Sequence, residues 1–199
     1  MLRRLVLAAA LPVISTLLVP VLVLVAAVIV ATKVGLAATY EIRSSSMEPT
    51  LHCARPAPGC TGRIADRILV LGHWPGGYGR GTLVAIRAPA RARTACGAVG
   101  VLAKRIVGLP GERVEVRVID GNGFVYIDGR RLPESYVAAS SRRTATRMTP
   151  VDVPRGRYFV LGDDRARSCD SRQWGTVSSG DILGKAVLTY WPPTRIHLP

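Results

Sequence analysis

The chain has 199 residues, of which 48% are hydrophobic, so it is long enough for one domain with a core and a short additional segment. Its 27 basic and 13 acidic residues give a formal net charge of +14. Charge alone would allow binding to anionic lipid or nucleic acid. The basic residues are scattered, however, and we find no recognition helix or zinc-binding pattern. Composition and pattern together therefore argue against a nucleic-acid-binding protein.

The first element in chain order is a long apolar segment. Residues 5–32 carry no charge over 28 positions. About 20 apolar residues in a helix cross the ~30 Å hydrocarbon core of a bilayer, so residues 5–32 are predicted to be a transmembrane anchor. A cleaved signal peptide is the alternative, with "GLAAT" at 35–39 as a weak cleavage site, but its apolar stretch is usually only about 7–15 residues. Arg3 and Arg4 favour a cytoplasmic N-terminus at residues 1–4 and an extracytoplasmic position for the rest of the chain.

Residues 33–43 are predicted to form a juxtamembrane segment and a first strand, and residues 44–199 an extracytoplasmic domain. The pattern in this domain is typical of antiparallel β structure, because short runs of β-branched and aromatic residues alternate with Gly, Pro and Asp. These runs lie at 67–71, 82–87, 113–119, 124–127 and 157–161. "DGNG" at 120–123 and "DG" at 128–129 predict tight hairpin turns. The polar residues 134–152 predict a mobile surface segment.

Four cysteines in an exported domain indicate disulfide bonds, and no CxxC metal or redox motif is present. Cys53 and Cys60 flank a loop rich in turn residues, which favours a local bridge and would leave Cys96 with Cys169. Four cysteines allow three pairings, and the spacing alone does not select one of them.

The stretch "RSSSMEPTLH" at 43–52 contains three consecutive serines, and one of them could be a nucleophile if a base removes its proton. Histidine is the usual base. The chain has His52, His73 and His197, and none lies in a sequence context that indicates catalysis. A serine hydrolase that uses His52 is nevertheless one alternative.

Lys104 is a second candidate base, within "GVLAKRIVGLPGE". This stretch is predicted to contain a strand. Side chains alternate between the faces of a strand, so Leu102, Lys104 and Ile106 would share one face. Desolvation lowers the pKa of a lysine, and a neutral lysine can act as a general base, which an arginine cannot. The alternative is a lysine whose amine simply extends to water.

The stretch "LGDDRARSCDSRQWG" at 161–175 holds three Asp, three Arg and two Ser. Such a stretch is either a solvated loop or a buried ion-pair network that supports a site. Asp170 and Arg172 are close enough in sequence to pair with each other, and each could also pair elsewhere.

Three separated segments together resemble one family. "SSSMEPTL", "AKRIVGLPGE" and "GDDRARSCDSR" are similar to the serine, lysine and Gly-Asp boxes of bacterial type I signal peptidases, in the family's order and behind an N-terminal anchor. "DRILV" at 66–70 and "YWPPTRI" at 190–196 resemble further family segments. The resemblance covers most of residues 41–196. It implies a mostly β, antiparallel, signal-peptidase-like catalytic domain behind one N-terminal transmembrane helix.

The resemblance also implies roles for four side chains. Ser46 matches the nucleophile and Lys104 the general base. Ser44 matches the serine whose hydroxyl helps to bind the oxyanion beside the Ser46 backbone N–H. Ser168 matches the hydroxyl that orients the lysine. The family mechanism needs no metal and no other cofactor.

Further positions of the third box are assigned in the same way. Asp170 and Arg172 match the ion pair that supports the site. Asp164 departs from the pattern, because Asn is usual there, and Cys169 occupies a small-residue position. A bond from Cys169 to Cys96 would tie the strand that carries the base to the supporting loop.

By resemblance, the protein is expected to be a single-pass enzyme of the cell membrane with a cytoplasmic N-terminus and an extracytoplasmic catalytic domain. Its expected partners are the lipid bilayer and exported preproteins with small residues at −1 and −3, whose signal peptides it removes. A narrow-substrate peptidase for pilin or conjugation precursors and a non-catalytic, membrane-anchored binding protein are alternatives. Ser46, Lys104 and Ser168 argue against the non-catalytic one. Self-cleaving repressors have a related Ser/Lys fold, but they carry a DNA-binding domain where this chain has its predicted membrane span.

Overall fold

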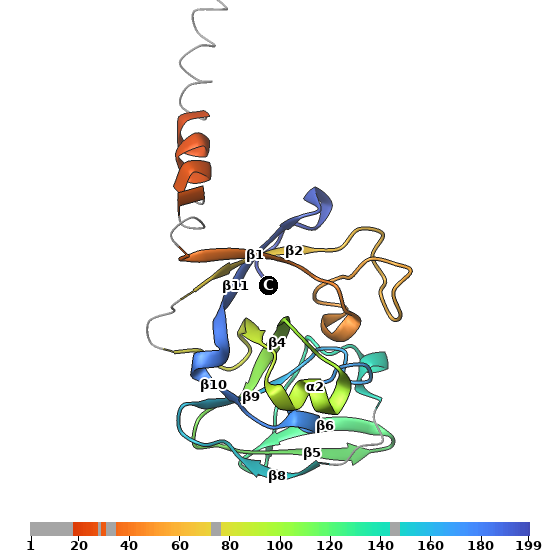
Figure 1. Cartoon of the computed structure of the whole chain (residues 1–199). Helices are drawn as coiled ribbons and strands as arrows, with labels where there is room; N and C mark the ends of the chain where they lie inside the picture. The colour runs from red at the N-terminus through yellow and green to blue at the C-terminus, as the bar shows by residue number, and fades with distance from the viewer. Residues whose placement is uncertain (1–17, 28, 31–34, 73–76, 144–147) are drawn as a thin grey trace, which may run out of the picture. The chain divides into compact units, whose positions relative to one another are not determined.

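The structure is a computed structural model, and it describes residues 18–27, 29–30, 35–72, 77–143 and 148–199. The chain divides into two units, Met1–Ala38 and Thr39–Pro199. In the first unit, residues 18–27 and 29–30 are helical and exposed (Figure 1). Among the described residues, no helix has both the length and the apolar character that a membrane crossing requires. The predicted anchor at 5–32 falls largely on residues outside this description.

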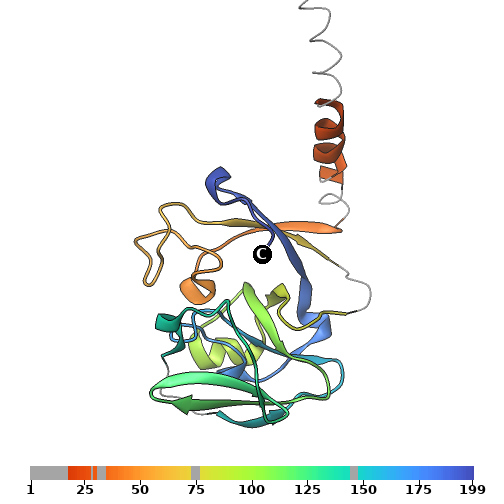
Figure 2. The same ribbon diagram turned by 180° about the vertical axis from the view of Figure 1, so that it is seen from behind.

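The described part of the second unit contains two β-sheets, seen from opposite sides in Figures 1 and 2. The larger sheet has the order β1-β2-β11-β3-β4-β9-β10, and the smaller has the order β7-β6-β5-β8. The larger comprises β1 (Ala37–Glu41), β2 (Arg67–Leu71), β3 (Leu83–Arg87), β4 (Val101–Gly108), β9 (Arg157–Leu161), β10 (Val177–Ser178) and β11 (Ile182–Trp191). The smaller comprises β5 (Arg113–Ile119), β6 (Asn122–Ile127), β7 (Arg130–Arg131) and β8 (Met148–Asp152). The predicted mostly antiparallel β fold is confirmed.

The structure has turns at both Asp-Gly pairs for which the sequence predicts hairpins. Asp120 and Gly121 have φ values of 49° and 72°, and they join β5 to β6. Asp128 and Gly129 have φ values of 49° and 79° between β6 and β7. Two successive residues with positive φ match the twist of antiparallel strands, and Asp-Gly accepts this conformation readily.

The prediction of a mobile surface segment at 134–152 is wrong in part. Residues 139–142 form the 3-10 helix η2 (Ala139–Arg142), and the segment ends in β8, which pairs with β5. Glu134 is buried because its carboxylate contacts Arg165 and Arg142. Arg165 lies 31 residues away, so local composition could not reveal that pairing. Residues 144–147 lie outside the described part of the chain.

Two core clusters position the segments that carry the candidate residues. The first buries Met47 and Leu51 against strands of the larger sheet, and this packing anchors the 3-10 helix η1 (Ser45–Met47). The second packs the short helices α2 (Ala90–Cys96) and α3 (Ser171–Trp174) against β3, β4 and β9 through side chains such as Ala92, Trp174 and Val160. The serine turn and the lysine strand are therefore both held by buried apolar contacts.

Candidate active site

The serine-rich stretch folds into the turn η1, which presents Ser46. Burial of Met47 (1% exposed) and Leu51 (0%) holds the turn in place, and the Leu51 N–H donates to Met47 O at 2.9 Å. Ser46 is itself 7% exposed. The Oγ atoms of Ser44 and Ser46 lie 3.2 Å apart, so both hydroxyls face the same small region.

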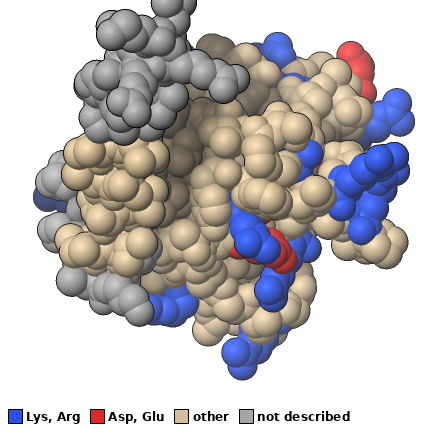
Figure 3. All heavy atoms as spheres, turned by 90° about the horizontal axis from the view of Figure 1, so that it is seen from above, with Lys and Arg blue, Asp and Glu red and all other residues tan. Residues whose placement is uncertain are grey.

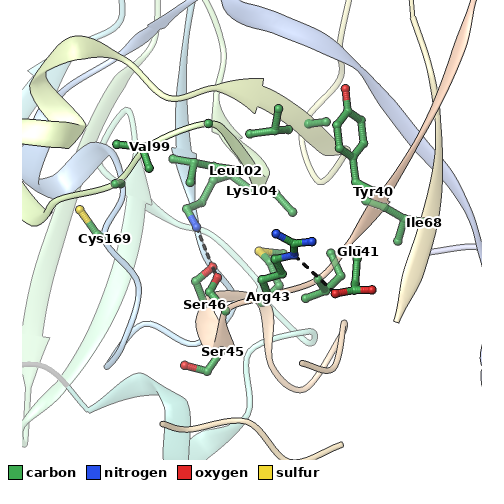
Figure 4. Close-up of a pocket in the computed structure, with 18 of the residues that line it drawn as sticks. Tyr40, Glu41, Arg43, Ser45, Ser46, Ile68, Val99, Leu102, Lys104 and Cys169 are labelled. Atoms are coloured by element: carbon green, nitrogen blue, oxygen red, sulfur yellow. Dashed lines mark hydrogen bonds and ion pairs between the residues drawn. The ribbon is translucent and has the colours of Figure 1, made fainter. Parts of the chain in front are cut away.

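Lys104 reaches this turn from β4. Its Nζ donates to Ser46 Oγ at 2.7 Å, although the two residues are 58 positions apart in the sequence (Figure 4). Burial lowers the pKa of Lys104 to about 8, an effect that the charges of Asp170 and Asp163 oppose and that of Arg172 assists. The distance and the lowered pKa are those that a general base needs to take a proton from Ser46.

The lowered pKa of Lys104 predicts a pH-dependent contribution to stability. Between about pH 8 and the ordinary value of 10.5, the unfolded chain holds the Lys104 proton and the folded chain does not. The free energy of unfolding should therefore rise with pH across this window. We expect Lys104→Met to be more stable than wild type near neutral pH, because the buried charge is removed, and to lack this rise. Urea denaturation at several pH values measures both effects.

Lys185→Met is the matched control, because Lys185 lies on β11 with its side chain only partly buried. The rise with pH that comes from Lys104 should remain in this control. An identical pH dependence for wild type and Lys104→Met would contradict the prediction.

The loop after β9 packs directly on η1. The Asp164 N–H donates to the Ser46 carbonyl at 3.1 Å, and the Ser168 N–H donates to Asp164 O at 2.8 Å. A Cβ at Gly162 would lie 2.3 Å from Ser46 O and 2.2 Å from Ser168 Oγ, so only glycine permits this approach. Ser168 Oγ is buried and has no hydrogen-bond partner among the described residues. Its role in orienting Lys104 stays a prediction.

Asp170 and Arg172 pair with each other, as the sequence suggested they could. Arg172 Nε donates to Asp170 Oδ1 at 2.8 Å and Arg172 Nη2 donates to Oδ2 at 2.9 Å, which is a bidentate pair with both side chains buried. Asp170 Oδ2 also accepts from the Gly162 N–H at 3.1 Å, and Arg172 Nη2 donates to Ser168 O at 3.1 Å. The pair thus ties both ends of the loop together.

A second buried pair was not identified from the sequence. Arg105 donates to Asp163 from Nε at 2.9 Å and from Nη2 at 2.6 Å, and Thr50 Oγ1 donates to the same carboxylate at 2.5 Å. The sequence offers only two signals for this pair: Arg105 follows Lys104 directly, and Asp163 lies in the charged stretch at 161–175. The structure shows that this pair links β4, the segment that follows η1 and the loop after β9.

The histidines have other neighbours. His52 Nδ1 lies 2.6 Å from Glu48 Oε2 and 2.9 Å from Thr61 Oγ1. His197 Nδ1 lies 2.9 Å from Arg195 O, and His73 lies outside the described residues. The structure therefore places Lys104, and not His52, within hydrogen-bond distance of Ser46 Oγ.

The structure contains disulfides between Cys53 and Cys60 and between Cys96 and Cys169, with Cα–Cα distances of 5.0 and 6.5 Å. The first closes the short loop that follows η1. The second joins the end of α2, just before β4, to the loop that carries Ser168.

Ser46 and Lys104 line a pocket of about 480 Å³. Much of its wall is apolar, from Ile42, Met47, Ile68, Ala85, Val99, Leu102 and Ala103. Figure 4 shows Ile68, Val99 and Leu102 at this wall. β9 pairs with β4 only from Arg105 onward. The first part of β4, residues 101–104, therefore has no paired β9 residue along that edge. Within the described ranges, no group of three or more His, Cys, Asp or Glu could hold a metal ion.

Comparison with known proteins identifies the family. The model of a family described as signal peptidase, peptidase S26, matches residues 14–191. The chain belongs to the peptidase S26 family of signal peptidases. A family model that covers nearly the whole chain agrees with the resemblance of the three sequence boxes, which this site brings together.

Two relatives named as signal peptidases come from different organisms. A probable signal peptidase I-2 from Synechocystis is 40% identical over 159 residues, which are 79% of this chain and 64% of the relative. A signal peptidase I U from Bacillus subtilis is 31% identical over 188 residues, which are 90% of this chain and 89% of the relative. A crystal structure of a signal peptidase I from Enterococcus faecalis matches 54% of this chain and 95% of its own chain, with 33% identity and a TM-score of 0.41.

Proposed function

We propose that this protein is a membrane-bound serine endopeptidase that removes N-terminal signal peptides from exported preproteins. The observation that carries the proposal is the 2.7 Å hydrogen bond from buried Lys104 Nζ to Ser46 Oγ inside the pocket. Membership of the S26 family supports the same reaction, as do the relatives named signal peptidase I. A Ser/Lys pair without a histidine is sufficient for this chemistry, because a neutral lysine can take the serine proton.

The proposed mechanism has two stages. Neutral Lys104 takes the Ser46 proton as Oγ attacks the scissile carbonyl, and the resulting oxyanion accepts hydrogen bonds from the Ser46 N–H and the Ser44 hydroxyl. One such donor can contribute about 3–4 kcal/mol to transition-state stabilisation. Protonated Lys104 then donates its proton to the leaving amine, which departs as the new N-terminus of the mature protein. Neutral Lys104 next activates a water molecule, which hydrolyses the acyl-enzyme and regenerates Ser46.

We also propose, from the family resemblance, a preference for small residues at −1 and −3 of the preprotein. In our proposal, the peptide lies as an added strand along the start of β4, where one edge has no partner in the β9 register. Alternate side chains of an extended peptide point to the same face. Residues −1 and −3 would both face the apolar wall near Ile42 and Leu102.

The enzyme is proposed to be a single-pass protein with residues 1–4 in the cytoplasm, residues 5–32 as the anchor and the catalytic domain outside. Residues 33–43 would connect the two parts. An anchor raises the local concentration of substrates that are themselves held in the membrane. Basic side chains outnumber acidic ones on the face drawn in Figure 3, which suits the surface of an anionic bilayer.

Cleavage of a preprotein by the full chain in detergent tests the proposal. Wild type should cut after a small-x-small sequence, and Ser46→Ala should abolish the cut because the nucleophile is removed. His52→Ala should keep the activity. N-terminal sequencing of the product locates the cleaved bond. No cleavage of any of several preproteins by folded wild type would overturn general signal peptide removal, and loss of activity in His52→Ala with retention in Ser46→Ala would overturn the nucleophile assignment.

A further inference from the structure

Arg167 lies at the same pocket as Ser46 and Lys104, but the mechanism above gives it no role. Its Nη1 donates to Asp164 Oδ2 at 2.8 Å. The Asp164 side chain is 1% exposed, whereas the Arg167 side chain is 58% exposed. The ion pair therefore has a buried acidic end and a solvent-facing basic end, so the charge that a ligand in the pocket would meet is the guanidinium.

The stem of Arg167 is also held. A Cβ at Gly59 would lie 2.7 Å from Arg167 Cδ and 2.8 Å from Ser45 Oγ. The loop closed by the Cys53–Cys60 disulfide thus packs against this stem and against the residue before the nucleophile. A side chain fixed at its stem and at one nitrogen loses less rotamer entropy when it binds a ligand than a free surface arginine does.

Two other cations, Lys104 and Arg43, line the pocket. Lys104 is 3% exposed and bonds to Ser46 at 2.7 Å, whereas Arg43 pairs with Glu41 at 3.4 Å and its side chain is 84% exposed (Figure 4). Arg167 differs from Arg43 by its shorter ion pair, at 2.8 Å, and by its less exposed side chain, at 58%. A guanidinium has five N–H donors. Within the described part of the chain, the Arg167 guanidinium donates one hydrogen bond, to Asp164. Several of its donors therefore remain for a ligand.

We infer that Arg167 is a specificity-determining residue that binds the carboxylate of an Asp or Glu side chain of the substrate close to the scissile bond. Asp164 holds the Arg167 guanidinium in position through their ion pair. The inference rests on the proposed function, because it takes the ligand to be a preprotein. A planar guanidinium matches a carboxylate with two parallel hydrogen bonds, which an amide of the same size cannot reproduce.

Binding of short peptides to the full-chain Ser46→Ala variant in detergent tests this inference without requiring turnover. Each fluorescent peptide carries an Ala-x-Ala sequence and a single Glu at −2, +1, +2 or +3, and each has a partner with Gln at that position. We expect one position at which Glu binds roughly threefold to tenfold more tightly than Gln. The preference should shrink at high ionic strength, because salt screens partly exposed charges.

Second substitutions in the Ser46→Ala background identify the cation. Adding Arg167→Gln should bring the Glu-to-Gln ratio to about one, and adding Arg167→Lys should keep part of the preference. Adding Arg155→Gln is the matched control, since Arg155 is exposed in the turn before β9, and it should leave the ratio unchanged.

Three results would overturn the inference: equal affinities for Glu and Gln at every position, a preference that survives Arg167→Gln, or no binding of any peptide. The proposed function fails separately, if wild type binds the peptides but cuts neither them nor a preprotein.

Discussion

Lys104→Arg is expected to lower kcat/KM for preprotein cleavage by about 10²- to 10⁴-fold, the usual contribution of a general base. Arginine keeps the positive charge, but it does not lose its proton in the accessible pH range, so it cannot accept one from Ser46. The 2.7 Å contact with Ser46 Oγ makes this loss direct. In wild type, kcat/KM should rise with pH through an apparent pKa of about 8, because only neutral Lys104 is active.

The larger arginine side chain could also disturb a site in which Lys104 is 3% exposed, so a second variant is needed. Lys104→Met has a similar length and no charge, and it should fold and be equally inactive. Lys185→Arg makes the same chemical change on β11 and should retain wild-type activity. Cleavage by folded Lys104→Arg at a rate close to that of wild type would rule out lysine as the base.

Gly162→Ala should disable the site although residue 162 takes no part in the chemistry. The added methyl group would lie 2.3 Å from the Ser46 carbonyl oxygen and 2.2 Å from Ser168 Oγ, so the turn and the loop must separate. A shift of about 1 Å in a reacting group can cost about 10²-fold in rate, and overpacking usually costs about 1–3 kcal/mol of stability. We expect losses of at least this size in kcat/KM and in the free energy of unfolding.

Gly180→Ala is the control for this substitution. A Cβ at Gly180 would meet only Ser178 Oγ, at 3.7 Å, which is an ordinary contact. Its free energy of unfolding should stay within about 0.5 kcal/mol of wild type, with full activity. Thermal unfolding and cleavage assays on the same preparations separate the two effects. Wild-type stability in Gly162→Ala would show that the loop can move away from Ser46 at little cost.

Several elements were predictable because their signal is local. The runs at 67–71 and 113–119 became β2 and β5, since β-branched residues alternate along them. The Asp-Gly pairs became turns because these residues accept positive φ. The long strand β11 was not predicted, since "ILGKAVLTYW" contains Gly184 and lacks a clear alternation of apolar and polar residues. Gly184 is required there because a Cβ would lie 2.2 Å from Leu71 O on the neighbouring strand.

The candidate site was predictable only in part, because only some of its contacts leave a local signal in the sequence. The alternation of side chains along a strand places Lys104 on a face with apolar neighbours. The family resemblance then predicts that Lys104 acts as the base for Ser46. The pairing of Arg105 with Asp163 and that of Arg165 with Glu134 could not be inferred in this way.

The sequence by itself determined the residue types that can react, the local turns, most strands and the family. Only the tertiary structure decided which charges meet. Residues 58 positions apart come together at Lys104 and Ser46, and again at Arg105 and Asp163, through the folding of the sheet and the loop after β9. Burial at that junction also sets the pKa of Lys104, because desolvation depends on everything packed around the amine and not on its neighbours in the chain.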